Sequence, residues 1–178
     1  MNDLVRNALM GAAGAGSKTT YVDDVFSTFL YTGNATARSI NNGIDLANEG
    51  GMVWTKSRSN GTDHYLGGPD LGTNKLLRSN TNGAEDSSYT SSLTSFNNNG
   101  FSLGTNGNVN GSGKTLASWT FRKQKGFFDV VTWTGGDETY KNISHNLGSV
   151  PGCIIVKRTS GGSGDWFVFH RDLNNGTN

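Results

Sequence analysis

The feature that most constrains this chain is a segment that it contains twice. Four short blocks of the first copy recur in the same order in the second, each displaced by 101 to 103 residues. The paired blocks are residues 26–33 with 128–135, 40–46 with 143–147, 51–56 with 152–157, and 63–65 with 165–167. This period is longer than the roughly 20–50 residues of solenoid repeats. The repeat therefore predicts two tandem domains rather than two layers of one stack.

The same register bears on where the second copy stops. Residues 70–74 are followed by a further stretch of the first copy, whereas the matching residues 172–178 are the last of the sequence. We expect the 178 residues to be the N-terminal portion of a longer polypeptide; the alternative is a degenerate half-repeat that packs on the first unit. The expected organisation is an N-terminal attachment helix and Gly/Ala tether over 1–20, a first β-sandwich unit over 21–125, and the start of a second, truncated β unit over 126–178.

Composition indicates an ordered β protein with many turns. The chain has 26 Gly and 2 Pro, only 33% hydrophobic residues, and 10% aromatic residues that sit in short alternating runs. A formal net charge of +1 argues against a nucleic-acid-binding protein, which needs a basic surface to neutralise phosphates. No apolar stretch approaches the about 18 residues of a membrane-spanning helix, and the N-terminus is a poor secretion signal. Cys153 is the only cysteine, which excludes an internal disulfide, and its apolar neighbours predict a buried small hydrophobe.

Period-two alternation and turn signals predict the strands. In the first unit they fall at residues 25–31, 37–40, 52–56, 64–66, 75–78, 100–103 and 115–121, with 81–95 as loop or edge strand. In the strand expected at 115–121, Ala117, Trp119 and Phe121 alternate with less apolar residues, so most of the apolar side chains lie on one face. In the second unit strands are expected at 127–133, 140–143, 153–158 and 166–170, after an exposed basic junction at 122–125. The predicted fold is mostly β, with tandem antiparallel, jelly-roll-like β-sandwich units and a short N-terminal α-helix.

The N-terminal helix is expected over residues 3–10, capped by Asn2. Its apolar residues Leu4, Val5, Ala8 and Leu9 share one face. A helix of about eight residues is unstable alone in water, so it needs its own domain, sister chains or a docking partner to lie on. The glycine- and alanine-rich residues 11–17 then form a tether, which suits an attachment peptide. The alternative is a frayed terminus.

Motifs that would carry catalysis are weak. Gly113, Lys114 and Thr115 end like a phosphate-binding loop, but Asn108 stands where the first glycine is needed and a strand rather than a helix follows. The three histidines lack metal-ligand spacing, no serine lies in a nucleophile-elbow context, and the paired acids at 85–86 and 137–138 lie in polar loops. We therefore expect no enzyme activity, no catalytic residues, no cofactor and no metal site.

The tryptophans offer the remaining candidate binding residues. All four tryptophans, Trp54, Trp119, Trp133 and Trp166, are able to stack on glycans, and Trp54, Trp133 and Trp166 are the selected candidates. All four fall in expected strands. Core packing is therefore the favoured interpretation of these side chains.

The blocks at residues 31–33, 40–46, 50–56 and 117–123 resemble a recurrent unit of marine bacteriophage virion proteins. The second copy matches that unit more closely, at 127–135, 143–158 and 166–171. The resemblance runs from about Tyr21 to the end of the chain. It implies concanavalin- or laminin-G-like jelly rolls strung along tail fibres or other virion appendages, and it brings no catalytic residues.

On this resemblance we expect a structural virion protein, the N-terminal part of a tail fibre or appendage. Residues 1–20 would dock it to other virion proteins of the tail, baseplate or nozzle, with Leu4, Val5, Ala8 and Leu9 as docking residues. The β units would extend toward the host surface for adhesion, in a homotrimer. The alternatives are a lectin-like carbohydrate-binding module that binds a host-surface glycan and a capsid-decorating head fibre.

Overall fold

The computed structural model describes residues 19–173, and the expected N-terminal helix with Leu4, Val5, Ala8 and Leu9 lies outside that range. The described chain is mostly β, as predicted, and its strands pair antiparallel throughout. In chain order the elements are α2 Val22–Val25, β1 Phe26–Thr32, β2 Arg38–Asn41, α3 Leu46–Glu49, β3 Gly51–Ser57, β4 Tyr65–Gly67, β5 Leu77–Arg78, β6 Leu93–Asn97, β7 Gly100–Leu103, α4 Gly107–Asn110, β8 Thr115–Arg122, β9 Cys153–Lys157 and β10 Trp166–His170.

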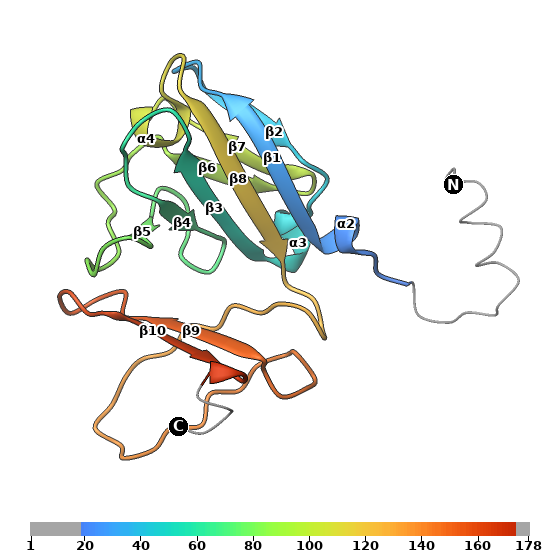
Figure 1. Cartoon of the computed structure of the whole chain (residues 1–178), viewed down its shortest axis with the longest axis vertical. Coiled ribbons are helices and arrows are strands. Elements are labelled where there is room, and N and C mark those ends of the chain that lie inside the picture. Colours follow the sequence, from blue (N-terminus) through green and yellow to red (C-terminus); the bar gives the residue numbers. More distant parts are fainter. Residues whose placement is uncertain (1–18, 174–178) are drawn as a thin grey trace, which may run out of the picture.

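Two sheets built from residues 26–122 lie face to face (Figure 1). The larger has the strand order β1-β8-β3-β4-β5 and the smaller β2-β7-β6. The core between them takes side chains from both sheets and from the connecting segments. Its fully buried members include Ile40, Val53, Phe101 and Leu116. The burial of these apolar side chains is the main force that holds the two sheets together.

The residues of β8 that face the core are not its most apolar residues. Leu116, Ser118 and Thr120 are fully buried between the sheets, so Trp119 and Phe121 lie on the outer face. The small polar side chains are tolerated in the core because they are hydrogen-bonded. The Thr120 hydroxyl oxygen accepts from Asn42 Nδ2 at 2.8 Å.

The hairpin β9–β10 repeats the pairing of β3–β4. In the first half Val53, Trp54 and Thr55 pair with Gly67, Leu66 and Tyr65. In the second half Ile154, Ile155 and Val156 pair with Phe169, Val168 and Phe167. Each residue of β9 is 101 places after its counterpart in β3, and each residue of β10 is 102 places after its counterpart in β4. The two hairpins therefore share one register.

The strands expected at 127–133 and 140–143 do not form. Within the described residues, the one β-type backbone pairing in this region is an isolated bridge between Gln124 and Phe128. Their counterparts in the first half, β1 and β2, take their backbone hydrogen bonds from β8 and β7. Among the described residues after 126, no strand takes the place that β8 or β7 has in the first half. A segment with an alternating sequence does not form a strand without a neighbour that satisfies its backbone hydrogen bonds.

Candidate functional site

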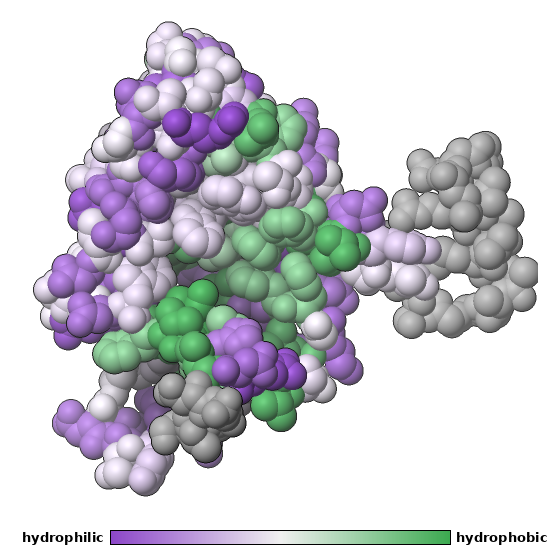
Figure 2. Space-filling model, viewed as in Figure 1, coloured by the Kyte–Doolittle hydropathy of each residue, from purple (hydrophilic) through white to green (hydrophobic). Residues whose placement is uncertain are grey.

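The outer surface of the five-stranded sheet carries an aromatic face, which we define as Phe26, Trp54, Trp119 and Phe121. Trp54 and Trp119 are direct cross-strand neighbours with ring centroids 5.7 Å apart, and Phe26 and Phe121 are 4.8 Å apart. Phe127 and Phe128 extend it, at 6.4 and 5.2 Å from Phe121. Figure 2 views this side, where apolar colour gathers over the sheet and continues onto the β9–β10 hairpin. The four side chains of the aromatic face are partly buried rather than fully exposed, and a cluster of apolar side chains on an outer surface can serve as a contact surface.

The three tryptophans predicted to stack on glycans lie on different elements. Trp54 is half-buried on β3 beside Trp119, which was considered for glycan stacking but was not among the three selected candidates. The alternation of β3 and β8 carried no signal for that pairing, because it does not reveal which strands are neighbours. Trp133 is 47% exposed in a segment without strands. The expectation that these two side chains pack in the core is wrong, since both lie outside the core cluster.

Trp166 has a structural role where the hairpin meets the sandwich. Its indole Nε1 donates to the backbone oxygens of Thr81 at 2.9 Å and Arg78 at 3.3 Å. Lys157 Nζ donates to the Asn82 oxygen at 3.2 Å and lies 5.9 Å from the Trp166 ring centroid. Burial, followed by the nearby Arg158, lowers the pKa of Lys157. We call Lys157, Trp166 and residues 78–85 the hairpin dock.

The backbone reinforces the hairpin dock. The amide of Gly164 donates to the Asn82 oxygen at 2.9 Å, and the amide of Glu85 donates to the Thr159 oxygen at 2.9 Å. These bonds join segments about 80 residues apart in the sequence. They hold the tip of the β9–β10 hairpin against the 81–85 segment.

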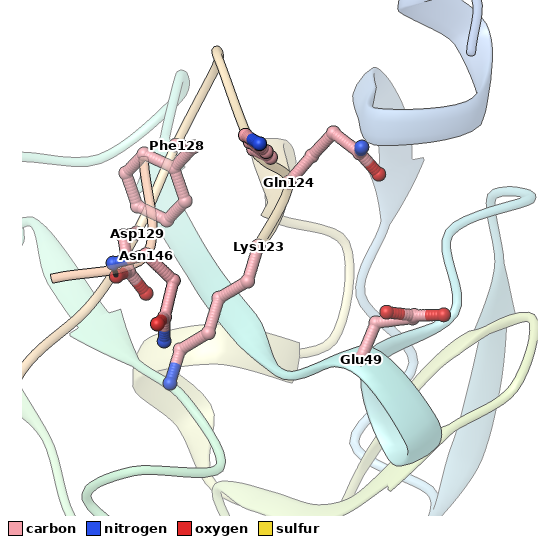
Figure 3. Close-up of a pocket in the computed structure, with 7 residues that line it drawn as sticks. Glu49, Lys123, Gln124, Phe128, Asp129 and Asn146 are labelled. Atoms are coloured by element: carbon pink, nitrogen blue, oxygen red, sulfur yellow. Dashed lines mark hydrogen bonds between the residues drawn. The ribbon is translucent and has the colours of Figure 1, made fainter. Parts of the chain in front are cut away.

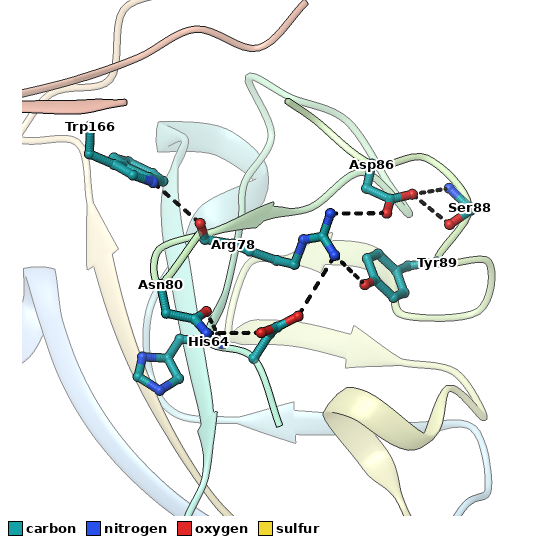
Figure 4. A network of polar contacts seen from close by, with 8 residues as sticks. His64, Arg78, Asn80, Asp86, Ser88, Tyr89 and Trp166 are labelled. Atoms are coloured by element: carbon teal, nitrogen blue, oxygen red, sulfur yellow. Dashed lines mark hydrogen bonds and ion pairs between the residues drawn. The ribbon is translucent and has the colours of Figure 1, made fainter. Parts of the chain in front are cut away.

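A polar network centred on Arg78 supports the same region (Figure 4). The two terminal nitrogens of its guanidinium lie 3.7 Å from Asp63 and 3.7 Å from Asp86, and Nη1 donates to the Tyr89 hydroxyl at 3.4 Å. Hydrogen bonds from the Ser88 hydroxyl and backbone amide lower the pKa of Asp86. The charged groups of this network contact one another, so we assign the network a structural role.

Replacing Trp166 with phenylalanine is expected to loosen the hairpin without unfolding the sandwich. The change removes the N–H that satisfies two carbonyl oxygens, at a cost of about 1–1.5 kcal/mol. Amide exchange in residues 153–170 should therefore rise about tenfold, as measured by hydrogen–deuterium exchange and mass spectrometry. Trp133→Phe, at an exposed site, is the matched control and should leave that exchange unchanged. Equal exchange in the two variants would remove the role assigned to Trp166.

The contribution of Asp86 to the stability of the first unit should decrease in acid. The folded-state pKa of Asp86 is lowered, so its contribution is fully present above the unfolded-state value of about 3.9 and is lost as pH falls through the folded-state value. We expect Asp86→Asn to lower the free energy of unfolding at pH 6. At pH 3 the difference in this free energy between the variant and the wild type should be smaller, and urea titrations at both pH values measure it. Asp137→Asn, in an exposed loop, should show no such convergence.

A cleft of about 250 Å³ lies at the junction between the sandwich and the segment after β8 (Figure 3). Its lining includes Glu49, Lys123, Asp129 and Asn146. Lys123 Nζ is paired with Asp70 at 2.6 Å, and Asp129 Oδ2 accepts from the Asn146 amide at 2.7 Å. The basic junction expected to be exposed and solvated is therefore partly wrong, since Lys123 is half-buried and ion-paired. These pairings indicate a structural junction rather than a binding pocket.

The position of Cys153 corrects one further prediction. Cys153 is exposed on β9, so its expected burial is wrong: among the described residues, its strand belongs to a two-stranded sheet with β10 and not to the sandwich of residues 26–122. Among residues 19–173, no group of three or more His, Cys, Asp or Glu side chains is placed to hold a metal ion. Within the same range no helix is long and apolar enough to cross a membrane.

Comparison with known proteins gives one family. The family model described as "Domain of unknown function (DUF7483)" matches residues 22–178. Neither a curated protein nor a solved structure matches the chain.

Proposed function

The chain belongs to the DUF7483 family, and we propose that it is a non-enzymatic structural component of a bacteriophage virion, in a tail fibre or similar appendage. The main observation behind the proposal is that the β3–β4 hairpin occurs a second time, with the same strand register, as β9–β10. Repeated β modules along one chain suit an extended appendage. The sequence resemblance to phage virion units supports the same assignment.

In this proposal residues 1–20 attach the chain to the particle and tandem jelly-roll-like units extend toward the host surface. Appendage chains of this kind would form a homotrimer. Exposed apolar side chains such as Ile155, at 61% exposure, and Phe127, at 44%, are available for contacts between copies. Analytical ultracentrifugation of the purified chain measures the oligomeric state, and a monomer at micromolar concentration would count against the trimer.

Immunogold electron microscopy of intact particles tests the location. Antibodies raised against the purified chain should label a tail appendage. Label on the head would favour a capsid-decorating fibre instead, and particles without label, despite label in the lysate, would remove the virion assignment. Deleting residues 1–17 should yield particles that lack the protein; its continued incorporation would show that attachment uses another segment.

The aromatic face favours a lectin-like module as the second candidate. Aromatic rings stack on the apolar faces of sugars, and Trp119 and Trp54 lie side by side on one rigid sheet. Trp54 Nε1 is buried without a hydrogen-bond partner, so binding there would use ring faces rather than that N–H group. Glycan binding that falls at least tenfold in Trp119→Ala and is kept in Trp133→Ala would support this candidate. Thermal unfolding of both variants controls for loss of fold.

A further inference from the structure

Asparagine followed by glycine is a dipeptide prone to spontaneous deamidation. Glycine has no Cβ to hinder its own amide nitrogen when that nitrogen attacks the asparagine side chain. Within residues 19–173 the dipeptide occurs at Asn42, Asn60, Asn82, Asn99, Asn106 and Asn110. Hydrogen bonds hold the side-chain amides of four of these residues in place, namely Asn42, Asn99, Asn106 and Asn110. The remaining two dipeptides, at positions 60 and 82, lie in segments without regular structure.

The reacting groups of the dipeptide at position 82 are free. Asn82 is exposed and lies between β5 and β6. Among the described residues, neither its side-chain amide nor the backbone amide of Gly83 has a hydrogen-bond partner. The Gly83 nitrogen and the Asn82 Cγ atom are therefore not tied to other groups.

The backbone oxygen of Asn82, in contrast, is held by two donors from the second unit. It accepts from the Gly164 amide at 2.9 Å and from Lys157 Nζ at 3.2 Å. The Lys157 ammonium is itself fixed, because it also donates to the Arg158 oxygen at 2.9 Å and the Gly164 oxygen at 3.0 Å. A deprotonated Gly83 amide shares its negative charge with the Asn82 oxygen. Two preorganised donors, one of them cationic, stabilise that anion.

A second cation lies on the other side of the same peptide group. A Cβ built on Gly83 would be 3.1 Å from Arg78 Nη2. The dipeptide at position 60 has no comparable surroundings: the Asn60 oxygen accepts from the neutral Thr62 amide at 2.9 Å, and its Oδ1 accepts from the Ser59 hydroxyl at 2.9 Å. The two dipeptides therefore differ in the charge that surrounds the reacting amide.

We propose that Asn82–Gly83 is a self-modification site, at which Lys157 promotes conversion of Asn82 to aspartate and isoaspartate. Hydroxide removes the Gly83 amide proton, and the nitrogen electron pair attacks Asn82 Cγ. The Cγ–Nδ2 bond breaks, and Nδ2 leaves as ammonia with a proton from water, which regenerates the hydroxide. Water then opens the resulting five-membered imide at either carbonyl carbon. The net reaction consumes one water and releases one ammonia.

The product changes the acceptor at the centre of the hairpin dock. In isoaspartate the main chain runs through Cγ, so the oxygen that accepts from Lys157 becomes part of a free carboxylate. The added methylene lengthens the main chain just before the Glu85 amide, which donates to the Thr159 oxygen. The reaction therefore alters the contact between the hairpin and the first unit as the protein ages.

The test is incubation of the purified full chain at mildly alkaline pH, followed over time by peptide mapping and mass spectrometry. In the folded protein Asn82 should convert about tenfold faster than Asn60, a difference that one charge-assisted hydrogen bond can supply. In urea-unfolded chain the two residues should convert at similar rates, because the fixed donors are gone. Chromatography of the peptides separates the aspartate product from the isoaspartate product.

Variants of Lys157 test its role. Lys157→Met removes the charge at similar length, so it should slow conversion of Asn82 about tenfold and leave that of Asn60 unchanged. Lys157→Arg keeps a cationic donor and should retain most of the rate. Lys141→Met, in an exposed segment, is the matched control and should change neither rate.

Two results would overturn the proposal. Faster conversion of Asn82 in Lys157→Met would show that the docked hairpin protects the dipeptide instead of activating it. Equal rates for Asn82 and Asn60 in the folded protein would show that the local donors have no effect. Neither measurement requires a virion, so the outcome is independent of the virion assignment.

Discussion

Replacing Phe101 with alanine is expected to lower the free energy of unfolding by about 3–5 kcal/mol. Phe101 lies on β7, is 0% exposed, and is among the largest fully buried side chains of the core. Its ring fills space between the two sheets, so truncation removes buried apolar surface and leaves a cavity. Since a domain of this size is stable by only about 5–15 kcal/mol, the variant should be close to unfolding. Urea titration followed by tryptophan fluorescence gives the measurement.

Leu30→Ala is the matched control for Phe101→Ala. Leu30 lies on the outer side of the same sandwich and is 58% exposed, so its truncation should change stability by less than about 1 kcal/mol. A loss from Phe101→Ala as small as that from Leu30→Ala would mean that the two sheets do not enclose the core described above.

Replacing Asn110 with leucine is expected to cost about 2–4 kcal/mol. Asn110 is fully buried at the end of α4. Its Nδ2 donates to the backbone oxygens of Thr36 and Gly104, both at 2.8 Å, and its Oδ1 accepts from the Asn34 amide at 3.2 Å. Leucine has a similar volume but leaves all three backbone groups without this partner. One side chain therefore joins the β1–β2 connection to the end of β7.

Chemical denaturation measures the loss, and hydrogen exchange should localise it to residues 33–36 and 104–106. Asn98→Ala, at an exposed position between β6 and β7, is the control and should change stability by less than about 0.5 kcal/mol. If both variants behave alike, the buried amide does not hold these segments together.

The sequence predicted most strands of the described chain. It did not separate β6, Leu93–Asn97, from residues 81–95, which were expected to be loop or edge strand. The alternation at 115–121 and 52–56 corresponds to β8 and β3, and the apolar runs at 153–158 and 166–170 correspond to β9 and β10. The strands expected at 127–133 and 140–143 were wrong although their patterns match the first copy. A strand needs neighbours for its backbone groups, and no local pattern states whether they are present.

The candidate site was predicted less well than the fold. All four tryptophans were considered for glycan stacking, and Trp54 was kept as a candidate while Trp119 was not, although the two rings are cross-strand neighbours. Trp166 was selected as a glycan-stacking residue, but its N–H group is used to hold the hairpin. Both outcomes depend on which distant segments come together, and the sequence of one strand contains no information on that.

The sequence alone determined where the alternating segments lie, and it determined that one hairpin occurs twice about 102 residues apart. It did so because side-chain alternation and turn preference are local properties of consecutive residues. Only the tertiary structure decided that β8 turns Trp119 outward and Ser118 inward, and that β9 pairs only with β10 among the described strands. Which face is buried and which edge is paired depend on contacts between residues tens of positions apart, and these exist only once the chain has folded.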